Sequence, residues 1–367
     1  MTHTKADSKP ARAQTPGLEK KRRIQLNGPY VYILLLMVSV GLAWIVPQAG
    51  ARGGWLRTEI TTRMAVFIIF ILQGLTLPTR ELRRGLSQAR VHAFTQGFIF
   101  IFIPALTWFL LLFFGPLYRY DLYMGFLLLA ALPSTISTSV VYTTQSGGAT
   151  SVALFNSSIS NILAVFLVPI WISWQIQAQV ALPPVGALIL KIALIVLLPF
   201  LIGQGIRQGV RAWADRRKKI MSNISMGLIL FIVFAAFCNS VKRRTWQGLE
   251  LWEIGLSFFS TLILLLLVMS AGGLCRKLAR FSREDGIAFF FSSTQKALST
   301  GVPMATAIFA STRMDLSLII VPLMMYHPLQ LLLGSLVVGR YASSGSGKGN
   351  TASGSSPLDP RGSNGLE

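Results

Sequence analysis

Long apolar runs, separated by short polar or basic segments, follow one another through most of this chain. About 20 consecutive apolar residues cross a bilayer as a helix, so the pattern predicts ten membrane spans. Polar segments flank the spans at 1–26, expected as a cytoplasmic N-terminal tail, and at 341–367, expected as a disordered cytoplasmic C-terminal tail. The predicted spans are 29–48, 59–78, 92–114, 121–144, 149–172, 186–207, 220–240, 251–274, 284–310 and 316–339.

This pattern predicts an all-α polytopic membrane protein with one ten-helix domain over residues 27–340. The spans divide into two sets of five, about 29–172 and 186–339. A unit with an odd number of spans that is duplicated in tandem inserts upside down the second time. We therefore expect two inverted five-helix repeats.

The composition supports a membrane protein. Hydrophobic residues make up 52% of the chain and charged residues only 13%, with a net charge of +21. The Lys and Arg residues lie between apolar runs, where they set membrane orientation, so we expect no nucleic-acid partner. The sequence contains no Walker loop, metal-ligand spacing or dinucleotide-binding glycine fingerprint, which argues against an enzyme. Cys238 and Cys275 are expected to be packing residues.

The loop charges predict the orientation of the chain. Most basic residues fall in three alternate loops, so we expect both termini in the cytoplasm and the protein in the plasma (inner) membrane. Lys242, Arg243 and Arg244 lie on the opposite side and run against this rule. The basic residues of the three loops are Arg80, Arg83, Arg84, Arg90, Arg207, Arg211, Arg216, Arg217, Lys218, Lys219, Arg276, Lys277, Arg280 and Arg283.

Two clusters of small polar residues, each with a proline, interrupt the fourth span of each half, at 132–139 and 292–303. Proline disfavours a continuous helix, and unwound backbone at membrane depth is tolerated only where it lines a cavity. Paired broken spans therefore indicate the binding site of a secondary transporter. The alternative is that these residues allow close helix packing. The candidate solute-binding residues here are Pro133, Ser134, Thr135, Ser137, Thr138, Ser139, Thr294, Gln295 and Lys296.

Lys296 lies about 20 Å from the nearer end of the ninth span, too deep for its side chain to reach the surface. An ammonium at this depth costs at least about 2.5 kcal/mol on insertion scales, and the spans offer no convincing acidic partner. It can face an anionic substrate, act as a fixed cation in an ion site, or lose its proton. A structural lysine bonded to carbonyls of the broken fourth helix is the alternative.

Further polar residues lie in the fifth and last spans. Asn156, Ser157 and Asn161 belong to adjoining rows on one side of a helix, as interhelical contacts or cavity wall. His327 precedes a proline at an expected kink, where it is either a proton relay or a hydrogen-bonded packing residue. His92 is expected at the membrane interface.

The stretch from Leu132 to Ile170, with STQKALSTGVP and PLMMYHPLQLL, closely resembles the bile acid:sodium symporter superfamily. The resemblance covers nearly everything between the tails. It is greatest to the branch of the seventh member of solute carrier family 10 and its bacterial and fungal relatives. It implies ten helices in a panel and a core domain, with the fourth and ninth helices broken and crossing, and alternating access by movement of the core.

In better-known members of this superfamily, two sodium ions bind at the crossing. The resemblance places a possible sodium site near Thr138, Ser139, Ser157 and Gln295. The acidic residue of the family pattern falls near Phe291, and Lys296 stands in the place of an amide. Without the carboxylate and with an added ammonium, at least one sodium site should be empty.

These observations predict a secondary active transporter of a small organic solute, specifically an amphipathic organic anion. The expected partners are this solute and the lipid bilayer. No cofactor is expected beyond Na⁺ or H⁺ as a coupling ion. The alternatives are a non-transporting membrane regulator of ion homeostasis on the same scaffold and a cation/proton antiporter, which normally needs intramembrane carboxylates.

Overall fold

The computed structural model describes residues 28–77, 88–176, 186–187, 190, 193–309 and 312–346. The described residues form helices and contain no strand. Both predicted tails, except for 341–346, and the loop arginines at 80, 83 and 84 lie outside them. In the first half, the main helices are α1 (Gly28–Ile45), α2 (Pro47–Gly50), α3 (Thr58–Thr76), α5 (Ala89–Gly97), α6 (Ile103–Phe114), α7 (Tyr120–Ala131), α8 (Ile136–Gln145) and α9 (Thr150–Ile176).

The second half contains α11 (Leu198–Lys242), α12 (Leu251–Leu278), α13 (Arg283–Thr294), α14 (Leu298–Phe309) and α15 (Leu316–Ser346). Short π-helical turns join α5 to α6 and precede α11. Six of the helical segments are long and apolar enough to cross a membrane, or up to seven when the bent pair α7–α8 is taken as one span. The all-helical membrane fold is therefore confirmed, whereas the ten spans and the inverted repeats stay predictions.

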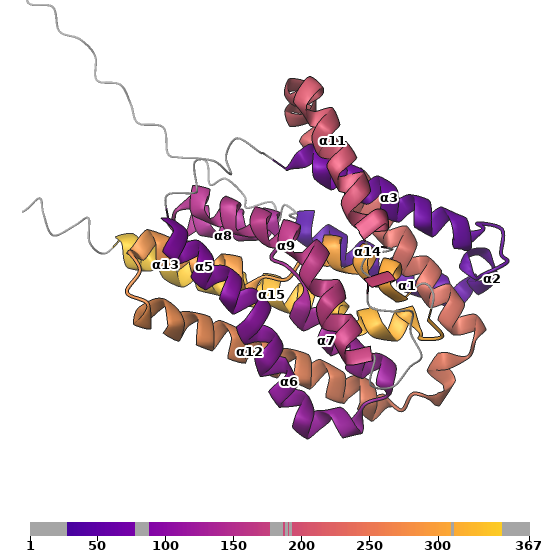
Figure 1. Cartoon of the computed structure of the whole chain (residues 1–367). Coiled ribbons are helices and arrows are strands. Elements are labelled where there is room, and N and C mark those ends of the chain that lie inside the picture. Colours follow the sequence, from indigo (N-terminus) through magenta and orange to yellow (C-terminus); the bar gives the residue numbers. More distant parts are fainter. Residues whose placement is uncertain are drawn as a thin grey trace, which may run out of the picture.

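The helices form two groups (Figure 1). In one group, α1, α2 and α3 pack along α11; in the other, α5 to α9 pack with α12, α13 and α15. Gly74 and Gly203 mark a close approach of α3 and α11, because a Cβ atom at either position would collide with the backbone of the partner helix. Two facing glycines let α3 and α11 approach without side chains between them.

The helix α11 differs from the prediction of two spans separated by a basic loop. Residues 208–219, expected as that loop, are helical, and the helix direction changes at Val210, the non-helical residue in this stretch (φ −115°, ψ 23°). These residues are helical because the stretch contains good helix formers such as Arg, Lys and Ala. Asp215 also forms ion pairs with Arg207 (2.7 Å) and Arg211 (3.8 Å).

Both predicted broken helices are interrupted. The chain leaves the helical conformation at Leu132–Thr135, between α7 and α8, and the two helices meet at 52°. It leaves it again at Gln295–Ala297, between α13 and α14. Each break is shorter than the polar cluster that predicts it, because most of the serines and threonines lie on helices that flank the breaks.

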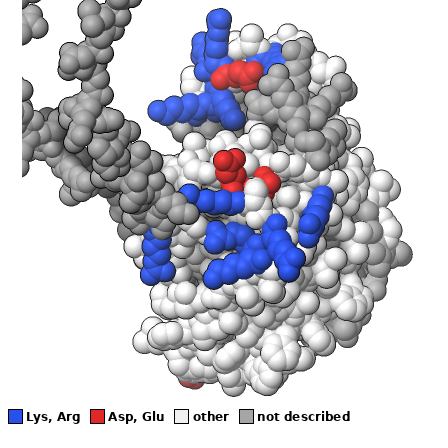
Figure 2. All heavy atoms as spheres, turned by 90° about the vertical axis from the view of Figure 1, so that its left-hand side faces the viewer, with Lys and Arg blue, Asp and Glu red and all other residues white. Residues whose placement is uncertain are grey.

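One end of the molecule is rich in Lys and Arg (Figure 2). The end of α12 and the beginnings of α13 and α5 lie at this end in Figure 1. They carry the exposed Arg90, Lys277, Arg280 and Arg283, which belong to two of the three loops predicted to be cytoplasmic. At the same end, α15 continues to Ser346, six residues into the segment expected as the C-terminal tail, and the prediction for that tail stays untested.

Candidate functional site

The two breaks meet inside the protein. The backbone N–H of Ala297 in the second break donates a hydrogen bond of 3.0 Å to the carbonyl oxygen of Pro133 in the first. Because proline offers no N–H and disfavours helix continuation, this carbonyl is free to pair outside its own helix. The residues on both sides of the contact are buried, so the crossing lies inside the helix bundle.

Hydroxyl groups of α8 and α9 satisfy the backbone of the first break. Ser134 donates its N–H to the hydroxyl of Ser160 (3.2 Å). Its own hydroxyl lies 3.1 Å from that of Ser139 and 3.3 Å from that of Ser157. Ser139 in turn donates to the carbonyl of Phe291 on α13 (3.0 Å). The small polar residues thus replace the helical hydrogen bonds that the break gives up.

Asn161 joins the first break to the helix that follows the second. Its amide nitrogen donates to the carbonyl oxygens of Ser134 (2.8 Å) and Ser157 (2.7 Å). Its amide oxygen accepts from the hydroxyl of Thr300 on α14 (2.8 Å). These donors and acceptors fix the orientation of the amide, because a reversed group would face a carbonyl with its oxygen.

A cavity of about 140 Å³ lies against this crossing. Its wall combines the first break and the beginnings of α8 and α14 with the end of α3 and the middle of α11. The lining residues include one basic side chain, Lys218, and no Asp or Glu. They are Gln73, Thr76, Leu77, Ser134, Thr135, Ile136, Ser137, Asn161, Phe200, Lys218, Ser222, Ser225, Met226, Ile229, Ala297, Ser299 and Thr300.

Lys296 points away from this cavity and is only 1% exposed. Its ammonium donates to the carbonyl oxygens of Ala130 (2.8 Å) and Leu132 (2.7 Å), at the end of α7. The last carbonyls of a helix lack partners within the helix and carry partial negative charge. Lys296 therefore caps the end of α7 through two N–H donors, which is the structural alternative considered above.

Gln330 on α15 holds the backbone of the second break. Its side-chain oxygen accepts from the N–H of Lys296 (2.6 Å), and its nitrogen donates to the carbonyl of the same residue (2.9 Å). The remaining proton of this nitrogen faces Nδ1 of His327 at 2.9 Å, so Nδ1 accepts and carries no proton. His327 also packs edge-on against Tyr32, with ring centroids 6.2 Å apart. The helix continues through Pro328 at the expected kink.

The other predicted residues divide between the crossing and its surroundings. Thr135 and Ser137 line the cavity. Thr138 on α8 donates at 3.5 Å to the side-chain oxygen of Gln295, which is fully buried. Thr294 lies directly before the second break, where its carbonyl accepts from the hydroxyl of Tyr326 (3.0 Å).

Asn156 on α9 contacts α5 instead of the crossing. Its side-chain oxygen is 3.0 Å from Nδ1 of His92 and 3.4 Å from Nε2 of Gln96, both on α5. His92 is buried between helices, with its ring centroid 4.1 Å from that of Phe155, and its expected position at the membrane interface stays a prediction. The polar pair joins α5 to α9 and removes Asn156 from the cavity wall.

The model of the SBF-like CPA transporter family matches residues 31–343. This chain belongs to that family. A relative from Pseudomonas aeruginosa, an uncharacterized protein, is 32% identical over 86% of this chain and 93% of its own length. The sodium/bile acid cotransporter 7 of Mus musculus is 31% identical over 84% and 91%, and that of Danio rerio is 31% identical over 84% and 92%. The chain is therefore a membrane transporter by family, not an enzyme.

The residues of this SBF-like transporter do not fit two sodium ions. The oxygens of Ser139 and Ser157 hydrogen-bond with Ser134, and Gln295 pairs with Thr138. Phe291 stands where the family resemblance places a carboxylate, and the described residues contain no cluster of three or more His, Cys, Asp or Glu side chains. The nearby cation is the ammonium of Lys296, bound to two backbone carbonyls.

Several residues of the candidate site were not predicted from the sequence. Gln330 was visible beside His327, but its partner is 34 residues away in the chain. Thr300 lies inside the second polar cluster, five residues after Gln295. Nothing in the local sequence indicates that its partner is on the fifth predicted span. Gln73, Ser222 and Ser225 reach the cavity from α3 and α11. Each of these three residues is an isolated polar residue in a long apolar or basic segment, and this pattern could have identified them as candidates.

Proposed function

We propose that this protein is a secondary active transporter that carries a small organic anion through the crossing of its two broken helices. The observation that carries the proposal is the cavity beside the hydrogen bond between Ala297 and Pro133. Unwound backbone inside a membrane domain supplies polar groups for a solute that continuous helices cannot supply. The ten-span, inverted-repeat architecture and the cytoplasmic location of both termini belong to this proposal.

The charge of the cavity wall favours an anion. Both α8 and α14 begin at the cavity, with Ser137, Ser299 and Thr300 in its wall. A helix N-terminus carries a partial positive charge and unpaired N–H groups, so two of them favour a carboxylate, sulfate or phosphate group. Lys218 adds a full positive charge. The apolar side chains Phe200, Met226 and Ile229 would receive the rest of an amphipathic molecule.

Alternating access requires a barrier that opens on one side at a time. A second cavity of about 230 Å³ lies at the other end of α3, which contributes Thr58, Glu59, Thr62 and Arg63 to its wall. Val66, Ile69 and Phe70, between the two cavities along α3, are almost completely buried, as are Ile232 and Val233 on α11. We propose that these apolar side chains form the closed barrier and separate when the two helix groups move.

The coupling ion in this proposal is not sodium. Two carbonyls at the crossing that could face a cation receive the ammonium of Lys296 instead, which is covalently tethered. A tethered cation neither leaves with the solute nor depends on the sodium gradient. We therefore propose a uniporter, an exchanger or a proton-coupled carrier.

Transport by purified protein in liposomes tests this function. A panel of carboxylate and sulfate conjugates would be offered with Na⁺, K⁺ or a proton gradient. We expect saturable uptake of an organic anion that does not change when K⁺ replaces Na⁺. If no anion is taken up and none raises the unfolding temperature, the transporter proposal fails and a non-transporting regulator on the same scaffold is favoured.

A further inference from the structure

The second cavity has a composition that neither the crossing nor the family assignment explains. It is about 230 Å³ in volume and lies between the beginning of α3, the end of α11 and the junction of α14 with α15. Three of its lining residues are arginines, Arg52, Arg63 and Arg243, and two are acidic, Glu59 and Asp315. From Thr62 here to Gln73 in the first cavity, α3 rises by about 17 Å, so the two cavities are separate sites along this helix.

The arginine side chains are available for a ligand. Among the described residues, none of the three guanidinium groups forms an ion pair or donates a side-chain hydrogen bond. Arg52 contributes only backbone groups, with its N–H donating to Asn239 and its carbonyl accepting from Lys242. A guanidinium group presents a planar set of donors that matches carboxylate, sulfate and phosphate oxygens.

The acidic residues of the cavity are already engaged. Oδ1 of Asp315 accepts from the N–H and hydroxyl of Ser317, and Oδ2 accepts from Thr245 at 2.7 Å. Glu59 accepts from the N–H of Gly53 at 2.6 Å and interacts electrostatically with Arg52 and Lys242. Outside the lining set, Asp121 interacts electrostatically with Asp315 and Arg243. The acids therefore hold the surrounding loops, while the guanidinium groups keep free donors.

A buried polar atom inside the cavity points to the same kind of ligand. Thr58 is the first residue of α3, is only 3% exposed and lines the cavity, and its hydroxyl has no hydrogen-bond partner among the described residues. The residue before it, Arg57, does not cap the helix with its side chain. A helix N-terminus without a side-chain cap, a free hydroxyl and three arginines all favour negative charge.

The location of these charges also needs an explanation. Lys242, Arg243 and Arg244 run against the excess of basic residues at the opposite end of the molecule. Orientation signals therefore do not account for them, since the insertion rule favours few basic residues on this side. A binding role for Arg243 explains why a positive charge is kept here.

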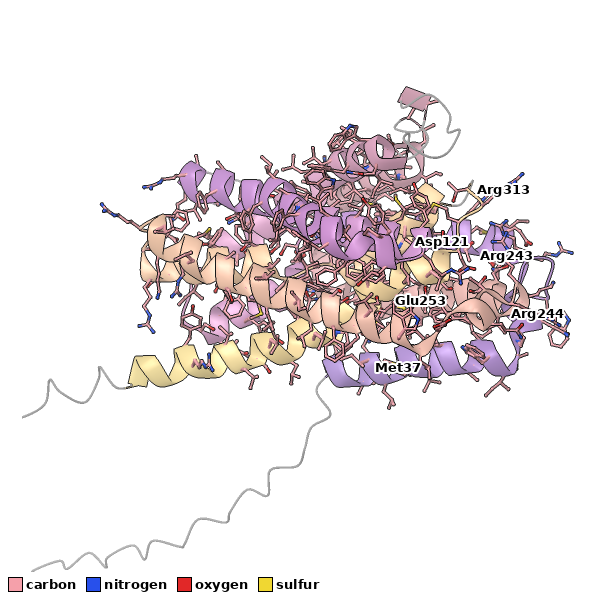
Figure 3. All side chains as sticks on the ribbon, turned by 90° about the horizontal axis from the view of Figure 1, so that it is seen from below. Met37, Asp121, Arg243, Arg244, Glu253 and Arg313 are labelled. Atoms are coloured by element: carbon pink, nitrogen blue, oxygen red, sulfur yellow. The ribbon has the colours of Figure 1, made fainter. Side chains whose placement is uncertain are left out.

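From these contacts we infer that this cavity is a second binding site, which takes the carboxylate, sulfate or phosphate group of a water-soluble anion. The inference goes beyond the transport function, because the site binds its ligand whether or not the crossing carries it further. Arg63 and Arg243 hold the anionic group from α3 and from the end of α11. Figure 3 shows Arg243, Arg244 and Arg313 at the same end of the molecule; Arg244 and Arg313 do not line the cavity.

The test uses inorganic phosphate as the probe and the full chain purified in detergent. Its binding would be measured by calorimetry and by the unfolding temperature, at constant ionic strength maintained with chloride. We expect saturable binding that weakens about tenfold in Arg243→Gln and in Arg63→Gln, the loss of one charged hydrogen-bonding partner. Arg313→Gln, the matched control at the same end, should bind phosphate as the unchanged protein does.

The outcomes separate this inference from its rivals. Absence of saturable binding, equal weakening in Arg313→Gln, or unchanged binding in both cavity variants would each overturn it. A lipid headgroup shares the same chemistry, so a second arm uses nanodiscs with and without phosphatidylglycerol. Stabilisation by this lipid alone, with no effect of free phosphate, would also overturn the inference. Phosphate binding without any solute transport in liposomes would refute the transport function and leave this site standing.

Discussion

The two breaks at the crossing consist of similar short polar segments, yet the protein completes them in different ways. Hydroxyl and amide groups of α8 and α9 satisfy the first break around Ser134, and one face of it lines a cavity. Gln330 and the buried ammonium of Lys296 satisfy the second break, of which Ala297 lines the cavity while Gln295 and Lys296 do not. Two similar breaks thus meet at one crossing, and the first contributes more of the cavity wall than the second.

This difference makes a simple prediction about substitutions. A change at the second break should lower stability, because it leaves buried backbone N–H and C=O groups without hydrogen-bond partners where water cannot reach them. A change at the first break should mainly weaken binding of the solute and should affect stability less, because water in the cavity can replace the lost side chain. The predictions below follow in order of expected effect on the free energy of unfolding.

The largest effect is expected for Gln330→Leu. This substitution removes both partners of the Lys296 backbone and leaves one buried N–H and one buried carbonyl unpaired. At about 1–3 kcal/mol for each group, we expect the free energy of unfolding to fall by about 3 kcal/mol. Unfolding in mixed micelles measures it. A stability equal to that of the unchanged protein would show that the second break does not need this support.

A smaller loss is expected for Lys296→Met, which keeps the volume and removes the charge. The carbonyls of Ala130 and Leu132 lose their donor, at about 1–3 kcal/mol each, while removal of the charge from the membrane returns about 2.5 kcal/mol. The difference predicts a net loss of about 1.5 kcal/mol. Lys218→Met, on the cavity wall, is the matched control. It should leave stability unchanged and weaken the binding of an anionic solute. A more stable Lys296→Met would contradict the capping role.

Asn161→Ala is expected to cost about 1 kcal/mol of stability, because Asn161 lines the cavity and water can replace its amide. Its effect on transport should be larger. Without the link between Ser134 and Thr300, the two sides of the site lose their fixed distance. We expect the apparent affinity for the transported anion to fall about tenfold. Affinity that stays unchanged, together with a stability loss like that of Gln330→Leu, would place both breaks in the same supporting role.

The smallest effect is expected for His327→Phe. The phenyl ring preserves the edge contact with Tyr32 and removes only the acceptor for one proton of Gln330. We expect a loss of about 0.5 kcal/mol and no change in the pH dependence of transport. A changed pH profile would assign His327 to a proton path.

Much of the fold can be predicted from the sequence, because the length and hydropathy of an apolar run identify a membrane helix. The breaks are also visible, since Pro133 and the neighbouring serines conflict with a continuous apolar helix. The first and last residues of each break cannot be read from the sequence. At the first break, Ser137, Thr138 and Ser139 are helical, because a new helix begins after Thr135. The basic stretch after Arg207 reads as a loop, although its residues are good helix formers that Asp215 joins by ion pairs.

The partners of the site residues cannot be read from the sequence. Lys296 contacts carbonyls more than 160 residues away, and backbone carbonyls carry no sequence signal at all. The buried lysine itself is visible as an anomaly, and its possible roles can be named. The position of the broken end of α7 decides which groups Lys296 contacts, and this position depends on the fold. The same holds for the cavity, since α3 and α11 supply half of its wall.

Calorimetric titration of the purified protein with Na⁺ tests the central claim most directly. Because the ammonium of Lys296 occupies the carbonyls at the end of α7, we expect no saturable heat up to tens of millimolar Na⁺ and no shift in unfolding temperature relative to K⁺. Saturable binding of two Na⁺ ions at millimolar concentration would contradict the account, because it would show that the crossing holds mobile cations beside the tethered one.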